Sequence, residues 1–395
     1  KAMINKYFGE IPAGAEVKKM EPMNVTLAET RKLWHEDNFA RVPQLNMVYP
    51  VPQMFSKESY ALDVLAQLLG QGKKSPMYKV LVKDKKLTSG VSVYYSAKEL
   101  ASEFRISVTA SPDTSLDKVE KAIFESYDLF EKEGFTENDL ERIKARLETD
   151  FYNNISSVMG KSFMLAYYDA LAGSPDYLMK EVDLIKGVTR EDVLNVYNKY
   201  IKGKNFVQTS FVPKGQSALI TQSAVNAGIV EEDITKATQK EVAQTAEEEI
   251  KKTPSKIDRS SAPVPGPDPS LTLPAVWKSE APNGMKISGI EQKELPLINY
   301  LLVIKGGHML DDPAKPGVAR FTAAMMNEGT KNLTPEELEE AIQRLGASIT
   351  VRGRDEDIMV SVSTLSRNFE KTLSLVEEIL LEPRWDEEQF ELNKT

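Results

Sequence analysis

The chain has 395 residues, 41% of them hydrophobic, which is enough for more than one domain with its own core. Its 50 basic and 59 acidic side chains give a net charge of -9, which argues against nucleic acid or an anionic membrane as the main partner. Cysteine is absent, so disulfides, thiol nucleophiles and thiolate metal sites are excluded. No stretch approaches the roughly 20 apolar residues of a membrane-spanning helix.

The first 14 residues predict the last turns of a helix, ended by Gly9, Pro12 and Gly14. Because Lys1 is not a natural start and the chain stops within a helical pattern, we expect an internal piece of a longer protein. Residues 1–14 are then the tail of an upstream domain.

Residues 15–215 predict one α+β domain. Gln44–Tyr49 is a strand candidate, and Ser56–Leu69 has apolar residues at helical spacing. Two alternating strands follow, around residues 91–95 and 104–108, and then a run of helices in which Thr136 and Thr189 mark helix starts. A strand at 206–212 completes the domain. Strands and helices in separate runs favour an antiparallel sheet packed with helices.

Residues 216–270 predict a linker. Glu231–Lys252 is highly charged with few apolar positions, and a cluster of prolines follows it. Such a segment has little apolar surface to offset the entropy of ordering it, so limited proteolysis is expected to cut first between Lys252 and Leu271.

Residues 271–395 predict a further α+β unit. Leu297–Ile304 is a nearly continuous apolar strand, and Thr334 with Glu337 caps a helix that Gly346 ends. Alternating residues 358–363 predict a strand, and Leu373–Leu380 a helix that stops before Pro383.

An internal repeat joins the two α+β regions. Val119–Lys144 and Phe369–Lys394 match with a constant offset of 250 residues, including identical charged residues such as Glu120/Glu370 and an aromatic residue at the same turn, Phe135/Trp385. The repeat predicts that both segments fold as similar helix-turn-helix units against a sheet.

The stretch Pro316–Thr330, P-G-V-A-R-F-T-A-A-M-M-N-E-G-T, has the frame of a zinc-protease helix without its ligands. It resembles the pitrilysin/insulinase-type metallopeptidases, whose inverted motif H-x-x-E-H falls inside this frame. Arg320 stands at the first His position, Ala323 at the catalytic Glu position and Ala324 at the second His position. These residues supply neither a metal ligand nor a general base. An ordinary buried helix fits the stretch equally well, and the repeat and the linker favour the resemblance.

The resemblance implies repeated units of antiparallel sheet and helices, arranged as domains of a clamshell-type metallopeptidase. It makes residues 15–215 the second, non-catalytic domain of a first half. Residues 271–395 become the start of a third domain with a degenerate zinc motif. The zinc, its additional Glu ligand and the catalytic Glu are then expected in the missing upstream domain. No cofactor, catalytic residue or metal ligand is expected in this chain.

A second family feature is an Arg and a Tyr that steady the substrate. In the related stretch here, Leu81–Ser89, Lys83 takes the Arg position and Ser89 the Tyr position, so bidentate recognition and a phenol donor are both lost. A charged helix end that leads into a strand is the favoured interpretation. The two histidines, His35 and His308, lie in different predicted domains, which argues against a shared metal site.

The sequence therefore predicts the non-catalytic portion of a zinc-dependent endopeptidase that degrades peptides inside a two-half chamber. Its expected partners are a peptide or small unfolded protein and the remaining domains of the parent chain. The alternative is a non-catalytic partner or core subunit of the same fold, which serves assembly or peptide binding beside a homologous subunit. Bacterial members of the family are often found in the cell envelope, so the resemblance implies the periplasm.

Overall fold

The computed structural model describes residues 2–15, 18, 20–23, 25–229, 254–258, 260, 266, 270 and 273–394. The chain divides into two compact units, one of Lys1–Glu21 with Ile229–Gln292 and one of Pro22–Gly228 with Lys293–Thr395. Most of the predicted linker, including Glu231–Lys252, lies outside the described residues. Within the described part of the chain, no helix is both long enough and apolar enough to cross a membrane.

The smaller unit contains a short helix and a hairpin. Helix α1 (Ala2–Phe8) ends where the N–H of Gly9 donates to the carbonyl of Asn5 at 3.0 Å, in agreement with the predicted helix end. Strands β7 (Val276–Glu280) and β8 (Lys286–Ile290) pair antiparallel. This hairpin, which we predict to begin the domain of residues 271–395, belongs to the smaller unit.

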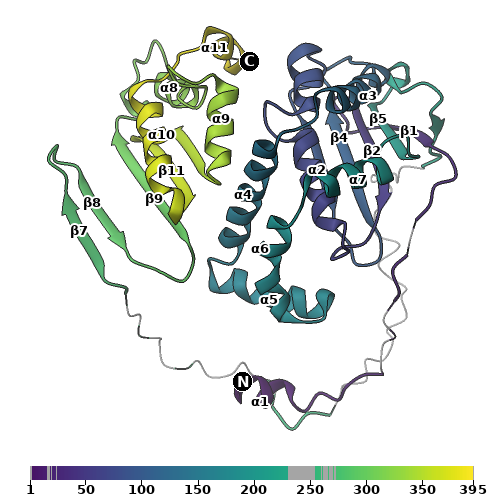
Figure 1. The fold of residues 1–395 in the computed structure, drawn as a ribbon, viewed down its shortest axis with the longest axis horizontal. Coiled ribbons are helices and arrows are strands. Elements are labelled where there is room, and N and C mark those ends of the chain that lie inside the picture. The colour runs from purple at the N-terminus through teal and green to yellow at the C-terminus, as the bar shows by residue number, and fades with distance from the viewer. Residues whose placement is uncertain are drawn as a thin grey trace. The chain divides into compact units, whose positions relative to one another are not determined.

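The larger unit is built on a mixed sheet (Figure 1). Its strands are β1 (Arg31–Asp37), β2 (Gln44–Val51), β3 (Val91–Ser96), β4 (Ser102–Thr109), β5 (Val207–Pro213) and β6 (Val225–Asn226), in the order β3-β4-β2-β5-β1-β6. Neighbours from β3 to β5 pair antiparallel, whereas β1 runs parallel to β5 and to β6. Since Val225 pairs with Leu33, the sheet extends past residue 215, where the sequence places the start of the linker.

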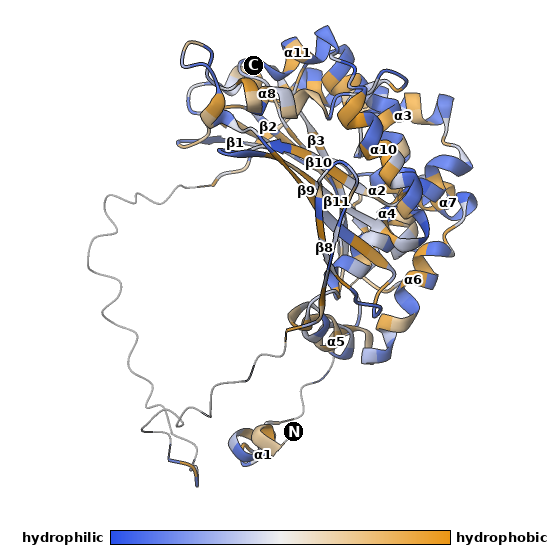
Figure 2. Cartoon of the chain, turned by 90° about the vertical axis from the view of Figure 1, so that its left-hand side faces the viewer, coloured by the Kyte–Doolittle hydropathy of each residue, from blue (hydrophilic) through white to orange (hydrophobic). Residues whose placement is uncertain are grey.

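The helices of this part lie on one side of the sheet, some of them on its face and others beyond it (Figure 2). They are α2 (Ser59–Gly70), α3 (Leu116–Glu133), α4 (Glu137–Asn154), α5 (Val158–Ala172), α6 (Leu178–Lys186) and α7 (Arg190–Tyr200), with a π-helical segment at Tyr78–Asp84. Alternate residues of β2, namely Leu45, Met47 and Tyr49, are buried beneath them. The predicted starts of α4 and α7 are confirmed, because Thr136 and Thr189 each form a capping box.

The second part of this unit repeats the plan on a smaller scale. Strands β9 (Leu297–Lys305), β10 (Ser348–Gly353) and β11 (Asp357–Leu365) form an antiparallel sheet in the order β10-β11-β9. Helices α8 (Val318–Met325), α9 (Pro335–Arg344), α10 (Phe369–Leu381) and α11 (Glu387–Asn393) accompany it. Ala323, Leu338, Val360 and Ile379 are at most 1% exposed and belong to its core. The fold class is α+β, as the sequence predicts.

The helix-turn-helix pairs α3–α4 and α10–α11 follow the predicted repeat. Thr136 caps α4 by accepting from the N–H of Asp139, and Asp386, at the equivalent position, caps α11 by accepting from the N–H of Gln389. The preceding strands do not keep the offset, because β4 ends at residue 109 and β11 at residue 365. The repeat is therefore closest over the two helices and their turn, with more chain between strand and helix in the first copy.

Helix α4 carries the contact between the two parts of the larger unit. Glu148 is 3% exposed and accepts from both terminal nitrogens of Arg367, at 3.2 and 2.8 Å, and from Lys186 at 2.8 Å. One turn of α4 also reaches α9, because the hydroxyl of Thr149 donates to the carbonyl of Gly346 at 2.7 Å. These contacts hold α9 and the start of α10 against α4.

Candidate functional site

Helix α8 forms where the sequence predicts the zinc-protease helix, and its first turn is fixed by one aspartate. Gly317, which precedes the helix, has φ +95°, a conformation that glycine adopts without a steric penalty. The Asp311 carboxylate accepts from the N–H groups of Gly317 at 2.8 Å and Ala319 at 3.0 Å. These are donors that the first turn of a helix cannot pair internally. A negative charge at this end is also favourable for the helix dipole.

The other end of α8 is fixed on strand β10 by Asn327. Its side-chain amide donates to the carbonyls of Ala323 at 2.9 Å and Val351 at 3.0 Å, and it accepts from the N–H of Val351 at 3.0 Å. A Cβ added to Gly353 on the same strand would stand 2.7 Å from Cα of Arg320. Helix and strand are therefore in direct backbone contact at the level of the motif.

The three motif positions lie on α8 in different surroundings. The Arg320 side chain is 61% exposed and its guanidinium lies 3.5 Å from the carboxylate of Asp355. Ala323 is 0% exposed and packs in the core of this part of the chain, and Ala324 is half-buried. A guanidinium and two methyl groups offer no electron pair to a metal ion. These residues do not fit a zinc site, and no metal-dependent step is assigned to them.

Asp355 also binds His308, a contact that the sequence does not predict. Nε2 of His308 lies 3.0 Å from Oδ1 of Asp355, the same oxygen that faces Arg320. The residue before His308 is Gly307, and a Cβ added there would stand 2.4 Å from the carbonyl oxygen of Arg354. Glycine at 307 therefore allows the two loops to approach, and it is the one feature of the sequence that hints at this contact. Within the described ranges, no group of three or more His, Asp or Glu side chains is arranged to hold a metal ion.

Lys83 and Ser89, the positions related to the substrate-steadying pair, lie in the first part of the larger unit. Lys83 lies in the last turn of the π-helical segment, and its ammonium forms an ion pair with Glu336 of α9 at 2.9 Å. The hydrogen bond that Lys83 donates to the Glu336 carboxylate raises the pKa of Lys83. Ser89 is exposed in the loop before β3. Lys83 thus contacts the start of α9.

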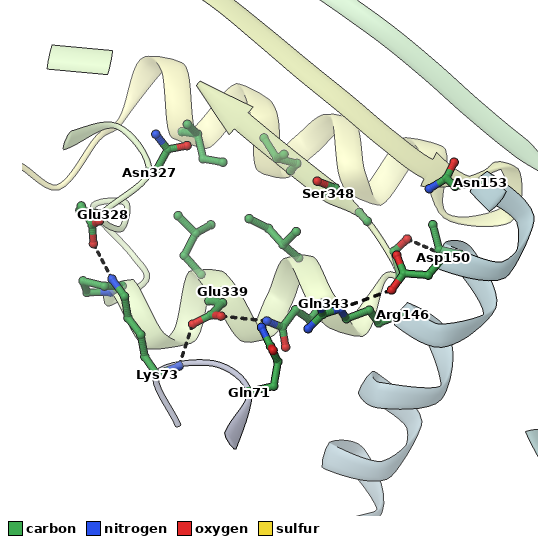
Figure 3. Close-up of a pocket in the computed structure, with 18 residues that line it drawn as sticks. Gln71, Lys73, Arg146, Asp150, Asn153, Asn327, Glu328, Glu339, Gln343 and Ser348 are labelled. Carbon is green, nitrogen blue, oxygen red and sulfur yellow. Dashed lines mark hydrogen bonds and ion pairs between the residues drawn. The ribbon is translucent and has the colours of Figure 1, made fainter. Parts of the chain in front are cut away.

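A polar cavity of about 440 Å³ lies beside α9, between Lys73, Arg146 and the strand β10 (Figure 3). Its charged groups bind one another. The ammonium of Lys73 lies 2.5 Å from Glu328, and the backbone N–H of Lys73 donates to Glu339 at 3.0 Å. Glu339 also accepts from Gln343 at 2.9 Å. Because these acids already have partners, we interpret the cavity as a polar contact between the two parts of the unit.

Two sequence families match the chain. Residues 1–147 match the family described as "Peptidase M16 inactive domain", and residues 292–395 match "Insulinase (Peptidase family M16)". The first match runs from α1 through most of α4, and the second contains α8 with its three altered motif positions.

Two curated proteins of Helicobacter pylori are similar in sequence. "Zinc protease PqqE" is 28% identical over 157 residues, which are 39% of this chain and 34% of that protein. "Non-peptidase homolog YmxG" is 27% identical over 105 residues, which are 27% of this chain and 24% of that protein. The matched regions thus span about a third or less of the length of these relatives.

Two solved structures are similar in fold. A protease from Helicobacter pylori is 21% identical, with a TM-score of 0.47, over 54% of this chain and 52% of that one. The periplasmic protease PqqL from Escherichia coli is 16% identical, with a TM-score of 0.44, over 97% of this chain and 43% of that one. The two matched families, on either side of residues 148–291, are both described as peptidase family M16. The chain belongs to the pitrilysin/insulinase-type peptidases, family M16.

Proposed function

We propose that this chain is the non-catalytic portion of a zinc-dependent endopeptidase that degrades peptides inside a two-half chamber. The observation that carries the proposal is α8. It forms a helix that is held against strand β10, but its motif positions are Arg320, Ala323 and Ala324. The match of residues 1–147 to an inactive peptidase domain supports the same assignment for the first part of the chain.

The chemistry of α8 agrees with a structural role. A general base for water needs a titratable group within reach of the reacting atoms, and Ala323 has none and is buried. Arg320 adds a positive charge where a metal ion would need an electron donor. The zinc, its ligands and the general base would therefore be supplied by another domain of the same protein.

The alternative function is that of a non-catalytic partner or core subunit, which keeps the fold for assembly or for peptide binding. The similarity to a protein named as a non-peptidase homolog favours this alternative. In that case a homologous subunit, and not another domain of the same chain, would supply the zinc site.

Partners and location follow from the proposed function. The substrate would be a peptide or a small unfolded protein, and the remaining domains would complete the chamber around it. The net charge of -9 makes nucleic acid an unfavourable partner. The periplasm is the proposed location, supported by the name of the periplasmic protease PqqL, to which the chain is similar.

The experiment is metal analysis and peptide hydrolysis by the purified chain. Inductively coupled plasma mass spectrometry is expected to find no stoichiometric zinc, and a quenched fluorescent peptide is expected to stay uncleaved with or without a chelator. The triple variant Arg320→His/Ala323→Glu/Ala324→His is expected to remain inactive, because position 323 is enclosed by the core. One tightly bound zinc per chain with chelator-sensitive cleavage would contradict the proposal.

A second measurement separates the two functions. The protein isolated from its source cells at its natural length is assayed with the same peptide and chelator. Chelator-sensitive cleavage by that protein alone supports the first proposal, in which this chain is a portion of an endopeptidase. Cleavage that appears only after a homologous subunit is added supports the alternative, in which this chain is a non-catalytic partner subunit.

A further inference from the structure

A second cavity lies within the first part of the larger unit, away from α8. It has a volume of about 500 Å³ and is lined by residues of α2, α5, α6 and β3, together with the loop at Phe55. This volume is in the range of ligand pockets, which are about 300–1,000 Å³. Its lining is unusual in composition, because it combines aromatic rings with two carboxylates, Asp63 and Glu181, and contains no Lys, Arg or His among the described residues.

The aromatic rings form connected walls. The ring of Phe55 lies 5.9 Å from that of Tyr167 and 6.0 Å from that of Tyr168, both on α5. Tyr177, behind the pocket, packs edge-on against Phe55 at 4.8 Å. Phe55 has φ +57°, a conformation that is strained for a residue with a side chain. The surrounding tyrosines hold this ring at the cavity in spite of that strain.

The two carboxylates both line this cavity and are partly buried. Glu181 accepts from the hydroxyl of Tyr60 at 2.7 Å, and burial raises its pKa. Burial also raises the pKa of Asp63, to about 6. Among the ion pairs within the described residues, none includes Asp63 or Glu181, and the nearby Arg146 faces Asp150 at 3.7 Å. A buried carboxylate without a cation is unfavourable, so a cationic ligand would stabilise this site.

We propose that the pocket between Phe55, Tyr60, Asp63, Tyr167 and Glu181 binds an organic cation, an ammonium or guanidinium group on an alkyl stem. The faces of the tyrosine and phenylalanine rings attract a cation and pack against its methylene groups, and the carboxylates neutralise its charge. An inorganic cation would gain nothing from the apolar walls. The inference does not depend on the proposed peptidase function, because a free cation and the basic side chain of a peptide offer the same group.

The test uses the 395-residue chain and isothermal titration calorimetry at pH 8. The free cations are agmatine and cadaverine, and 1-pentanol is the neutral comparison. The peptides are acetyl-Gly-Lys-Gly-amide and acetyl-Gly-Arg-Gly-amide, with norleucine at the central position as the neutral comparison. We expect at least tenfold tighter binding of the cations than of their neutral counterparts. Preference for the free amines or for the peptides identifies the source of the ligand. Equal binding of charged and neutral probes, or no binding of any cation, overturns the proposal.

Variants assign the binding to this pocket. Asp63→Asn/Glu181→Gln is expected to weaken cation binding at least tenfold. Asp183→Asn removes a charge from an exposed position of the same helix α6 and is expected to change binding less than twofold. An equal loss in both variants would show that only the net charge matters, and would contradict the proposed site.

The aromatic wall is tested without a change of charge. Tyr167→Phe keeps the ring and is expected to bind the cation within about twofold of the original chain, whereas Tyr167→Leu keeps an apolar side chain and is expected to bind several-fold more weakly. Equal affinity of the two variants would show that the ring face does not contribute. Because Tyr167 is 39% exposed, both variants are expected to fold, and circular dichroism checks this directly.

Discussion

Surroundings, as much as residue type, distinguish the three altered positions of α8. Arg320 is on the exposed side of the helix, where it forms an ion pair with Asp355, and Ala323 is completely buried. Substitution at an exposed position changes the stability of the fold little, whereas a carboxylate introduced at a buried position loses its hydration. The loss of the motif is therefore hardest to reverse at Ala323.

Asp63 provides a prediction at the same scale. Its pKa is about 6 in the folded chain, above the ordinary 3.8, so its charged form destabilises the fold above pH 6 and this effect disappears below pH 4. Asp63→Asn removes the charge and is expected to stabilise the chain at pH 8 by roughly 1–3 kcal/mol, with little effect at pH 4. Gln67 and Arg146 oppose the shift, and Glu181 and Asp150 add to it.

Urea denaturation of both chains at pH 4 and pH 8 measures this difference. Asp183→Asn is the control, since that side chain is exposed, and it is expected to change stability by less than about 0.5 kcal/mol at either pH. A destabilised Asp63→Asn variant at pH 8 would show that the carboxylate is satisfied in the folded chain.

Among the elements, α4 is the helix that joins the two parts of the larger unit. It closes the core of the first part through residues such as Leu140 and Ile143, and its other side meets α9 through Thr149 and Arg142. Its partner at the end of α9 is Gly346, with φ +57°. A Cβ at Gly346 would stand 2.7 Å from the carbonyl oxygen of Ala145, so the close approach of the two elements depends on glycine.

Gly346→Ala is expected to destabilise the chain by about 2–4 kcal/mol, because it adds a steric clash with α4 to the strain of a left-handed conformation. Gly173→Ala is the matched control. Gly173 has φ +80° but no atom within 4 Å of an added Cβ, so only the strain of about 1–2 kcal/mol is expected. Thermal denaturation compares the two variants, and equal losses would show that packing on α4 does not require glycine at 346.

For the molecule as a whole, oppositely charged residues connect the two parts of the larger unit. Lys73, Lys74 and Lys83 face Glu328, Glu340 and Glu336 at 2.5, 3.0 and 2.9 Å. Exposed pairs of this kind contribute little, but the Lys73 and Glu328 side chains are only 23% and 17% exposed. This pair therefore contributes more to the contact than the exposed pairs around it.

Lys73→Glu is expected to destabilise the contact by about 2–3 kcal/mol, because it places two carboxylates together in a partly buried site. Lys73→Glu/Glu328→Lys restores opposite charges and is expected to recover about half of that loss or more. The control is Lys85→Glu, in an exposed pair with Glu125, where less than about 1 kcal/mol is expected. Limited proteolysis and thermal denaturation measure the effect, and failure of the double variant to recover would place the loss elsewhere.

Local patterns in the sequence determine the ends of many elements. Thr136, Thr189 and Thr334 each start a helix with a capping box, because the cap and its partner lie three residues apart. The alternation of β3, β4 and β11 is equally local. The bounds of helix α5 are not predicted, although the sequence around Gly160–Ser162 is helical in character, since Val158, Met159 and Phe163 are exposed and form no buried stripe.

Contacts between distant residues are decided only by the tertiary structure. The sequence identifies the degenerate frame of α8, but the burial of Ala323 and the convergence of His308 and Arg320 on Asp355 depend on how the sheet approaches the helix. Tyr60 and Glu181 are 121 residues apart and meet in the aromatic cavity because α2 and α6 pack in the same unit. The spacing of residues along a chain predicts only contacts within a helical turn or along a strand. Contacts between remote side chains depend on how the whole core packs.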